Sequence, residues 1–233
     1  MVQLSNNPAY SILRVRFTKT GDLQYVSHLD LVRTMQKIIV RAALPLWYTE
    51  GFNPKPKMTF AAPLSVGTES LCELMDLRVT EQLSPEEILS RLNKNSTDEM
   101  RFTEAYYPEV PITSIAYLSY TFDIMTLGDI TEVQKRCTEA LRAPSLKIVK
   151  KTKSGEAEVD IAPLVKSTEV KVVDDRLVID ALLSSSPSAF LSPELLVRYL
   201  KENAGILSSP KITDEWYTVL RTEAYGEDMQ KFR

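Results

Sequence analysis

Apolar residues recur at helical spacing between Ser27 and Ala43, and this is the clearest hydrophobic pattern in the chain. Ser27 predicts the N-cap of a helix, and the carboxylate of Asp30 is placed to reach back to the cap amide. Pro45 ends the helix. The face that we expect to be buried consists of Leu31, Met35, Ile38, Ile39 and Ala42. A second face carries a stripe of positive charge at every fourth position, from Arg33, Lys37 and Arg41.

Strand and loop patterns flank this helix. Residues 12–17 alternate apolar and basic, which predicts a half-buried strand with Arg14 and Arg16 on its polar face. Residues 23–26 predict a short strand that leads into the helix. After the helix, residues 50–57 are Glu-Gly-Phe-Asn-Pro-Lys-Pro-Lys, a loop that two prolines stiffen.

The order of predicted elements is similar in the two halves of the chain. In each half a strand is followed by a helix, further strands, a second helix that begins at Ser-Pro-Glu, and a last strand. This order predicts an α+β fold of two tandem ferredoxin-like (split βαβ) units with antiparallel sheets. We expect an N-terminal ferredoxin-like domain over residues 1–106, a linker over 107–115 and a C-terminal ferredoxin-like domain over 116–233, with a frayed end over 226–233. A single larger α+β domain is the alternative, because the second half has extra hairpins.

The distribution of charge points to one face of the protein. The chain of 233 residues has a net charge of −3. Residues 1–60 nevertheless carry eight lysine and arginine residues against three aspartate and glutamate residues. A basic front on an otherwise acidic protein suggests a face for a polyanion such as RNA. The alternative is a solvated surface without a ligand.

Motifs for several kinds of active site are missing from the sequence. With one histidine and two distant cysteines, Cys72 and Cys137, the chain offers no zinc spacing and no iron–sulfur cluster site. It also lacks the glycine-rich phosphate-binding motifs and the Gly-x-Ser-x-Gly elbow. We therefore expect no cofactor and no metal. No apolar run is long enough for a membrane span and no signal peptide is evident. Because the two cysteines cannot make a disulfide framework, we expect a reducing cytoplasm as the location.

His28 is the one candidate for acid–base chemistry near neutral pH. It could move a proton during cleavage of an RNA backbone, or it could cap its helix or contact a phosphate without chemistry. The aromatic residues Trp47, Tyr48 and Phe52 could stack on bases or pack within the fold. The residues that we expect to bind RNA or another substrate are Arg14, Arg16, Tyr25, Ser27, Arg33, Lys37, Arg41, Phe52, Asn53, Lys55 and Lys57.

Two long stretches, Ser-His-Leu-Asp at residues 27–30 and Glu-Gly-Phe-Asn-Pro-Lys-Pro-Lys at 50–57, resemble the signature of the bacterial radical-SAM-linked protein family. Arg-Val-Arg-Phe at 14–17 and Pro-Leu-Ser-Val-Gly at 63–67 fit the same signature. This family is a domain of unknown function found adjacent or fused to cobalamin-binding radical SAM proteins. The resemblance implies a radical SAM enzyme as partner, in neighbourhoods concerned with RNA and ribosomes, and it implies no particular reaction.

A second resemblance is architectural. Tandem ferredoxin-like units with a histidine in the first helix are similar to the CRISPR RNA-processing endonucleases, although this chain has no glycine-rich loop near its C-terminus. Together these observations favour an RNA- or substrate-binding accessory module for a radical SAM enzyme. The alternatives are a metal-free RNA endonuclease that uses His28 and a protein-docking adaptor without nucleic acid.

Overall fold

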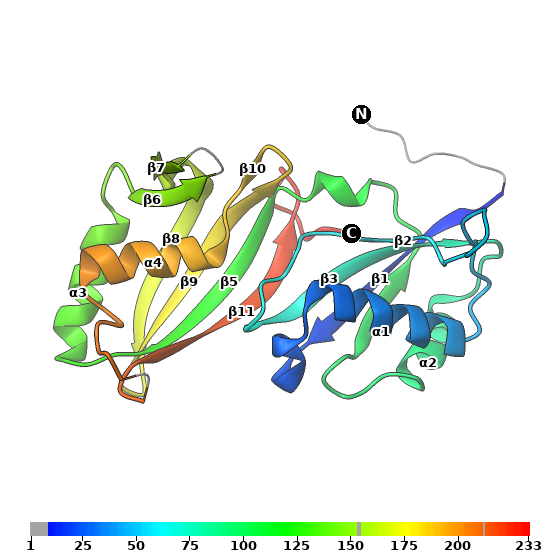
Figure 1. The fold of residues 1–233 in the computed structure, drawn as a ribbon, viewed down its shortest axis with the longest axis horizontal. Coiled ribbons are helices and arrows are strands. Elements are labelled where there is room, and N and C mark those ends of the chain that lie inside the picture. The colour runs from blue at the N-terminus through cyan, green and yellow to red at the C-terminus, as the bar shows by residue number, and fades with distance from the viewer. Residues whose placement is uncertain (1–8, 153–154, 212) are drawn as a thin grey trace. The chain divides into compact units, whose positions relative to one another are not determined.

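The computed structural model of the chain describes residues 9–152, 155–211 and 213–233 as a mixed α+β fold with antiparallel sheets. The chain forms two compact units (Figure 1). The first unit contains residues 9–115 together with Gly226–Arg233, and the second contains Ala116–Tyr225. The segment expected to be a linker, residues 107–115, therefore belongs to the first unit, and so does the end of the chain.

The first unit is a four-stranded sheet with two helices. Its elements in chain order are β1 (Ser11–Lys19), α1 (His28–Arg41), β2 (Met58–Phe60), β3 (Thr68–Val79), α2 (Pro85–Asn93) and β4 (Phe102–Tyr106). Within this unit the strands lie in the order β4–β1–β3–β2, and every pair of neighbours is antiparallel. Residues 23–26 do not form the expected strand, because Gly21–Tyr25 forms a 3₁₀ turn, η1, directly before α1.

The second unit has the same order of paired elements with two additions. Its elements are β5 (Tyr117–Met125), α3 (Ile130–Leu141), β6 (Lys147–Thr152), β7 (Gly155–Asp160), β8 (Val165–Val173), β9 (Arg176–Ser186), β10 (Ala189–Phe190), α4 (Pro193–Ala204) and β11 (Trp216–Tyr225). The main strands lie in the order β8–β9–β5–β11, again antiparallel. The additions are a separate β6–β7 hairpin and the short strand β10, which pairs with β9.

Helix α1 begins as the sequence predicts. The Ser27 hydroxyl oxygen accepts a hydrogen bond from the backbone N–H of Asp30 at 3.2 Å. The Asp30 carboxylate does not reach the cap amide; instead it accepts hydrogen bonds from the Ser27 hydroxyl at 2.8 Å and from Arg33 at 2.9 Å. All five residues predicted for the apolar face are buried. The prediction of this helix and of its buried face is confirmed.

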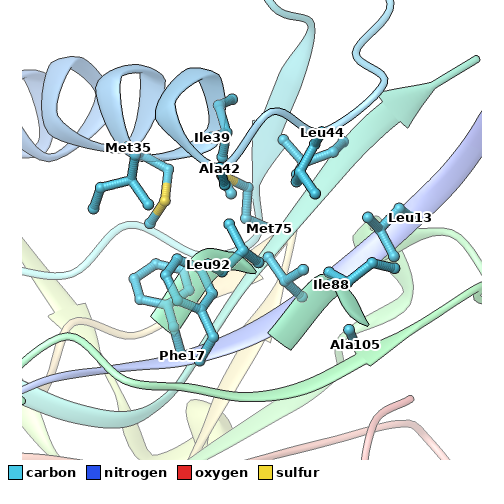
Figure 2. Packing of buried hydrophobic residues seen from close by; sticks show 14 of the residues in the cluster. Leu13, Phe17, Met35, Ile39, Ala42, Leu44, Met75, Ile88, Leu92 and Ala105 are labelled. Carbon is cyan, nitrogen blue, oxygen red and sulfur yellow. The ribbon is translucent and has the colours of Figure 1, made fainter. Parts of the chain in front are cut away.

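Both helices of the first unit pack on the same face of its sheet. Figure 2 shows Met35 and Ile39 of α1, and Ala42 directly after the helix, above the sheet residues Phe17 and Met75. In α2, Ile88 and Leu92 are fully buried in the same hydrophobic cluster. The face of α1 opposite these buried residues is therefore left for solvent.

The end of the chain is not frayed. Phe232 is buried, and its ring lies 5.1 Å from the guanidinium carbon of Arg14 in β1. Arg233 forms an ion pair with Glu104 of β4 at 3.6 Å. The expectation of a loose terminus was wrong because the last residues cover the face of β1 that the helices leave open.

We expect Ile39→Ala to lower the free energy of unfolding by about 2–5 kcal/mol, because it opens a cavity beneath α1. The neighbouring change Val40→Ala removes an exposed side chain from the same helix and should alter stability by less than about 0.5 kcal/mol. Urea denaturation followed by circular dichroism measures both. Equal effects of the two changes would contradict the packing described here.

Candidate functional site

The stripe of positive charge predicted on α1 lies on the surface of the first unit. Arg33, Lys37 and Arg41 are all exposed. Arg33 pairs with Asp30 through a contact of 2.9 Å between two exposed side chains, which holds it weakly. Among the described residues, Lys37 and Arg41 have no carboxylate partner. Two of the three cations are therefore free to meet an anion from solution.

The loop after α1 is closed at its base by backbone hydrogen bonds. The N–H of Thr49 donates to the carbonyl of Lys55 at 2.9 Å, and the N–H of Lys57 donates to the carbonyl of Trp47 at 3.2 Å. The N–H of Lys55 also donates to the hydroxyl oxygen of Thr49 at 3.1 Å. Since Pro54 and Pro56 fix their own φ angles, these bonds hold the tip of the loop in place.

The tip of this loop is fully open to solvent. Phe52 has an exposed fraction of 112 %, so its ring is not packed against any other residue that the structure describes. Asn53, Lys55 and Lys57 are exposed as well, and neither lysine has a carboxylate partner in the part of the chain that the structure describes. Gly51 has φ of +118° with no atom near the position of a Cβ, so the turn before Phe52 relies on glycine for its backbone conformation.

The loop and the end of α1 are fastened to the same end of β3. The carbonyl of Pro45, which follows α1, accepts a hydrogen bond from the N–H of Thr80 at 2.8 Å. The carbonyl of Lys57 accepts one from the N–H of Arg78 at 3.2 Å. We use the term basic surface for the five cations on this helix and this loop, which are Arg33, Lys37, Arg41, Lys55 and Lys57.

The Trp47 side chain packs at the base of the loop. The guanidinium carbon of Arg78 lies 5.2 Å from the Trp47 ring and 4.3 Å from the Tyr10 ring. The two rings themselves are 5.5 Å apart. Of the three aromatic residues considered for stacking, Trp47 therefore supports the loop, Tyr48 is partly exposed, and Phe52 is free.

His28 lies at the other end of α1, in an exposed and partly apolar environment. Its ring stands edge-to-face with Phe60 at 5.3 Å. No residue in the described ranges is hydrogen bonded to the ring, so nothing there fixes its tautomer as a catalytic histidine requires. Ser27 beside it uses its hydroxyl to cap the helix.

Exposed apolar side chains lie near His28. Tyr25, Leu29 and Val66 have exposed fractions of 67 %, 57 % and 55 %. The backbone N–H of Gly67 donates to the carbonyl of Gln24 at 2.9 Å, which brings the loop of Val66 beside the turn of Tyr25. We name these three residues the Tyr25 patch. Leu29 and Val66 were not predicted as site residues, because single exposed apolar residues are common on protein surfaces.

Arg14 and Arg16 do not belong to the basic surface, contrary to the expectation from alternation. Arg14 is fully buried, and its Nε lies 2.6 Å from Oδ1 of Asp76 while Nη2 lies 3.0 Å from Oδ2. Nη2 also donates to the carbonyl of Val110 at 3.0 Å. Arg16 is half-buried and lies 3.6 Å from Glu104. The polar face of β1 was expected to meet solvent, but residues around Val110 and Phe232 cover it.

The described residues hold no group of three or more histidine, cysteine, aspartate or glutamate side chains arranged to bind a metal ion. Cys137 is fully buried in α3, and burial raises the pKa of its thiol to about 11. A thiol with this pKa stays protonated near neutral pH and is a poor nucleophile. Among the described residues, no helix is both long and apolar enough to cross a membrane.

A family model for an uncharacterized protein conserved in bacteria, DUF2344, matches residues 13–193. The chain belongs to this family. The match includes α1, the loop of Phe52 and most of the second unit. No curated protein matches the chain. The resemblance to a bacterial domain of unknown function is confirmed to this extent, and the link to radical SAM enzymes remains a prediction.

Comparison with solved structures supports the fold. A chain in a structure entitled "Crystal Structure of a Cbf5-Nop10-Gar1 Complex" is similar with a TM-score of 0.51 and 11 % identity, covering 93 % of this chain. This chain spans 50 % of that chain. An unknown protein from Galdieria sulphuraria aligns with a TM-score of 0.26 and 8 % identity over 91 % of this chain and 98 % of its own. At such identities the first likeness shows a mixed α+β fold and nothing of function.

We expect Asp76→Asn to destabilise the protein strongly, by about 3–5 kcal/mol, because it leaves the buried Arg14 guanidinium without its counter-charge. The matched control is Asp98→Asn, which removes an exposed partner of Arg101 and should leave the unfolding midpoint unchanged. Urea denaturation distinguishes the two variants. A small effect of Asp76→Asn would show that the Arg14 charge is solvated.

Proposed function

We propose that the first unit of this protein binds RNA through the basic surface and the loop that carries Phe52. The observation that carries this proposal is the loop itself. A loop closed by hydrogen bonds and stiffened by prolines carries two exposed lysines, Lys55 and Lys57, together with the ring of Phe52, which packs on none of the described residues. Packing of the protein does not require these side chains, and phosphates with bases are ligands that use both cations and aromatic rings.

The distribution of paired and unpaired charge favours an anionic ligand. Arg14 of β1 is neutralised by Asp76, and Arg16 lies near Glu104. By contrast, four of the five cations of the basic surface lack a carboxylate partner among the described residues. Neighbouring cations without counter-charges, such as Lys37 with Arg41 one helical turn on, repel one another, and a polyanion relieves that repulsion while releasing its own counterions.

For the fold, we infer that both units are ferredoxin-like. In each unit the first helix connects the first and second strands, and the third strand lies between these two in the sheet. The strand order is therefore 4-1-3-2 once β6, β7 and β10 are set aside. This is the arrangement that a split βαβ unit requires. The helices of the first unit then share one face of its sheet, in agreement with its single hydrophobic cluster.

For the partner, we propose that the module serves a radical SAM enzyme. Support comes from the resemblance of residues 27–30 and 50–57 to the signature of the radical-SAM-linked family. The Tyr25 patch offers a surface for such a protein, because exposed apolar groups at the edge of a site often contact a partner. Coexpression with a cobalamin-binding radical SAM enzyme from the same genome should give a complex on size-exclusion chromatography, and Tyr25→Ser with Leu29→Ser should weaken that complex.

We expect RNA binding to weaken steeply with salt and to depend on the basic surface. If about four phosphates are neutralised, affinity for single-stranded RNA should fall about 50-fold from about 50 to about 200 mM salt. We reverse four charges in one variant, with the changes Lys37→Glu, Arg41→Glu, Lys55→Glu and Lys57→Glu. This quadruple variant should bind RNA at least about tenfold more weakly than the unmodified protein at low salt. Fluorescence anisotropy with bulk cellular RNA fragments measures this.

A matched control reverses four exposed lysines of the second unit, so that the net charge changes equally. Lys135, Lys150, Lys201 and Lys211 are suitable because they are exposed. This control should retain the affinity of the unmodified protein. Equal losses in the two reversal variants would assign binding to net charge, and no binding by the unmodified protein at low salt would refute the proposal.

The same purified protein and labelled RNA also test the alternative that the protein is an endonuclease. An accessory module should leave labelled RNA at full length during prolonged incubation with EDTA. Cleavage that disappears in His28→Ala while affinity is retained would instead establish a metal-free nuclease. The docking alternative predicts binding of a protein partner that is insensitive to salt, because an apolar patch rather than a set of ion pairs would carry it.

A further inference from the structure

The exposure of Phe52, on the loop that carries Lys55 and Lys57, has a cost for the free protein. Burial of a phenylalanine side chain contributes about 1.5–3 kcal/mol, and with an exposed fraction of 112 % this residue gains none of it. The loop does not need the ring for its own stability either, since its closure rests on backbone hydrogen bonds and on the hydroxyl of Thr49. The ring is thus available for a ligand.

The frame around Phe52 reduces the entropy lost when a ligand binds. Both ends of the loop are anchored at its base, where Trp47 contacts Arg78 and Lys57 is hydrogen bonded to Arg78. Pro54 and Pro56 restrict the segment between the ring and the lysines. A side chain that is already presented in this way loses little freedom on binding, which is the condition for affinity from a small contact.

The neighbours of the ring indicate what stacks on it. A hydrophobic pocket in a protein partner would also accept a phenylalanine, but lysine is depleted from the cores of protein interfaces. Here Lys55 and Lys57 follow Phe52 on the same short loop and are exposed. A nucleotide supplies an aromatic face for the ring and a phosphate for the ammonium groups at once.

The ring can stack on a base only where the face of that base is free. In a duplex both faces of each base are covered by its neighbours, and A-form RNA offers proteins mainly its backbone and shallow groove. We infer that the loop recognises an unpaired base in single-stranded RNA, with Phe52 stacked on the base and Lys55 and Lys57 on the adjoining phosphates. This inference rests on the proposed function and names the class of RNA that it binds.

The test compares single-stranded and duplex RNA with the full chain. A fluorescein-labelled oligouridylate, alone or annealed to oligoadenylate, is titrated with the unmodified protein and with Phe52→Ala. The variant should lose about 5- to 150-fold in affinity for the single strand, while its affinity for the duplex and its salt dependence stay unchanged. Phe52→Trp should bind nearly as the unmodified protein does, because the indole also stacks.

The control and the contradicting results are equally specific. Phe190→Ala removes another exposed phenylalanine, on β10 of the second unit, and should have no effect. If Phe52→Ala binds the single strand normally, or weakens on both RNAs alike, the stacking inference is wrong while RNA binding stands. If the unmodified protein binds neither RNA at low salt, the proposed function itself fails.

Discussion

The packing of α1 on its sheet is the constraint on which the candidate site depends. Leu31, Met35 and Ile39 are buried against β1 and β3, and each contributes about 1.5–3 kcal/mol through burial. Turning the helix to hide its cations would expose these side chains, so the orientation of the helix is fixed. The row of Arg33, Lys37 and Arg41 is outward as a consequence, at no cost in folding beyond the mutual repulsion of three cations.

The second constraint acts at the end of β3. Backbone groups of Arg78 and Thr80 bind both the end of α1 and the base of the Phe52 loop. The end of the helix and the base of the loop are thereby held at one end of the same strand, and neither can shift without breaking its own hydrogen bonds to that strand end. The ring of Trp47 against Arg78 adds to this anchor. A rigid scaffold that presents an exposed loop is a common arrangement for binding sites.

Local patterns predicted α1, its cap and the exposed lysines of the loop, because each depends on residues within a few positions of one another. The position of Arg14 depends instead on Asp76, Val110 and Phe232, which lie far along the chain. Alternation in residues 12–17 shows which side chains share a face of the strand. It does not show whether a distant segment covers that face, and so Arg14 and Arg16 were assigned to the surface wrongly. The sequence also failed to predict that the C-terminal residues are ordered, because they too contact residues far away along the chain.

The two units offer an internal comparison, because they share one order of strand pairing and differ in surface. Helix α3 occupies the place of α1, yet its exposed positions mix the acidic Glu132 and Glu139 with the basic Lys135 and Arg136. The connection after this helix also differs.

After α1 the chain forms the Phe52 loop, whose two lysines have no carboxylate partner within the described ranges. After α3 it forms the β6–β7 hairpin, where Lys147 pairs with Glu158 at 2.8 Å. The same fold therefore supports one surface with unpaired cations and one whose charges are mixed or paired. Since a fold by itself does not determine function, the contrast locates the proposed RNA site in residues particular to the first unit rather than in the architecture that both units share.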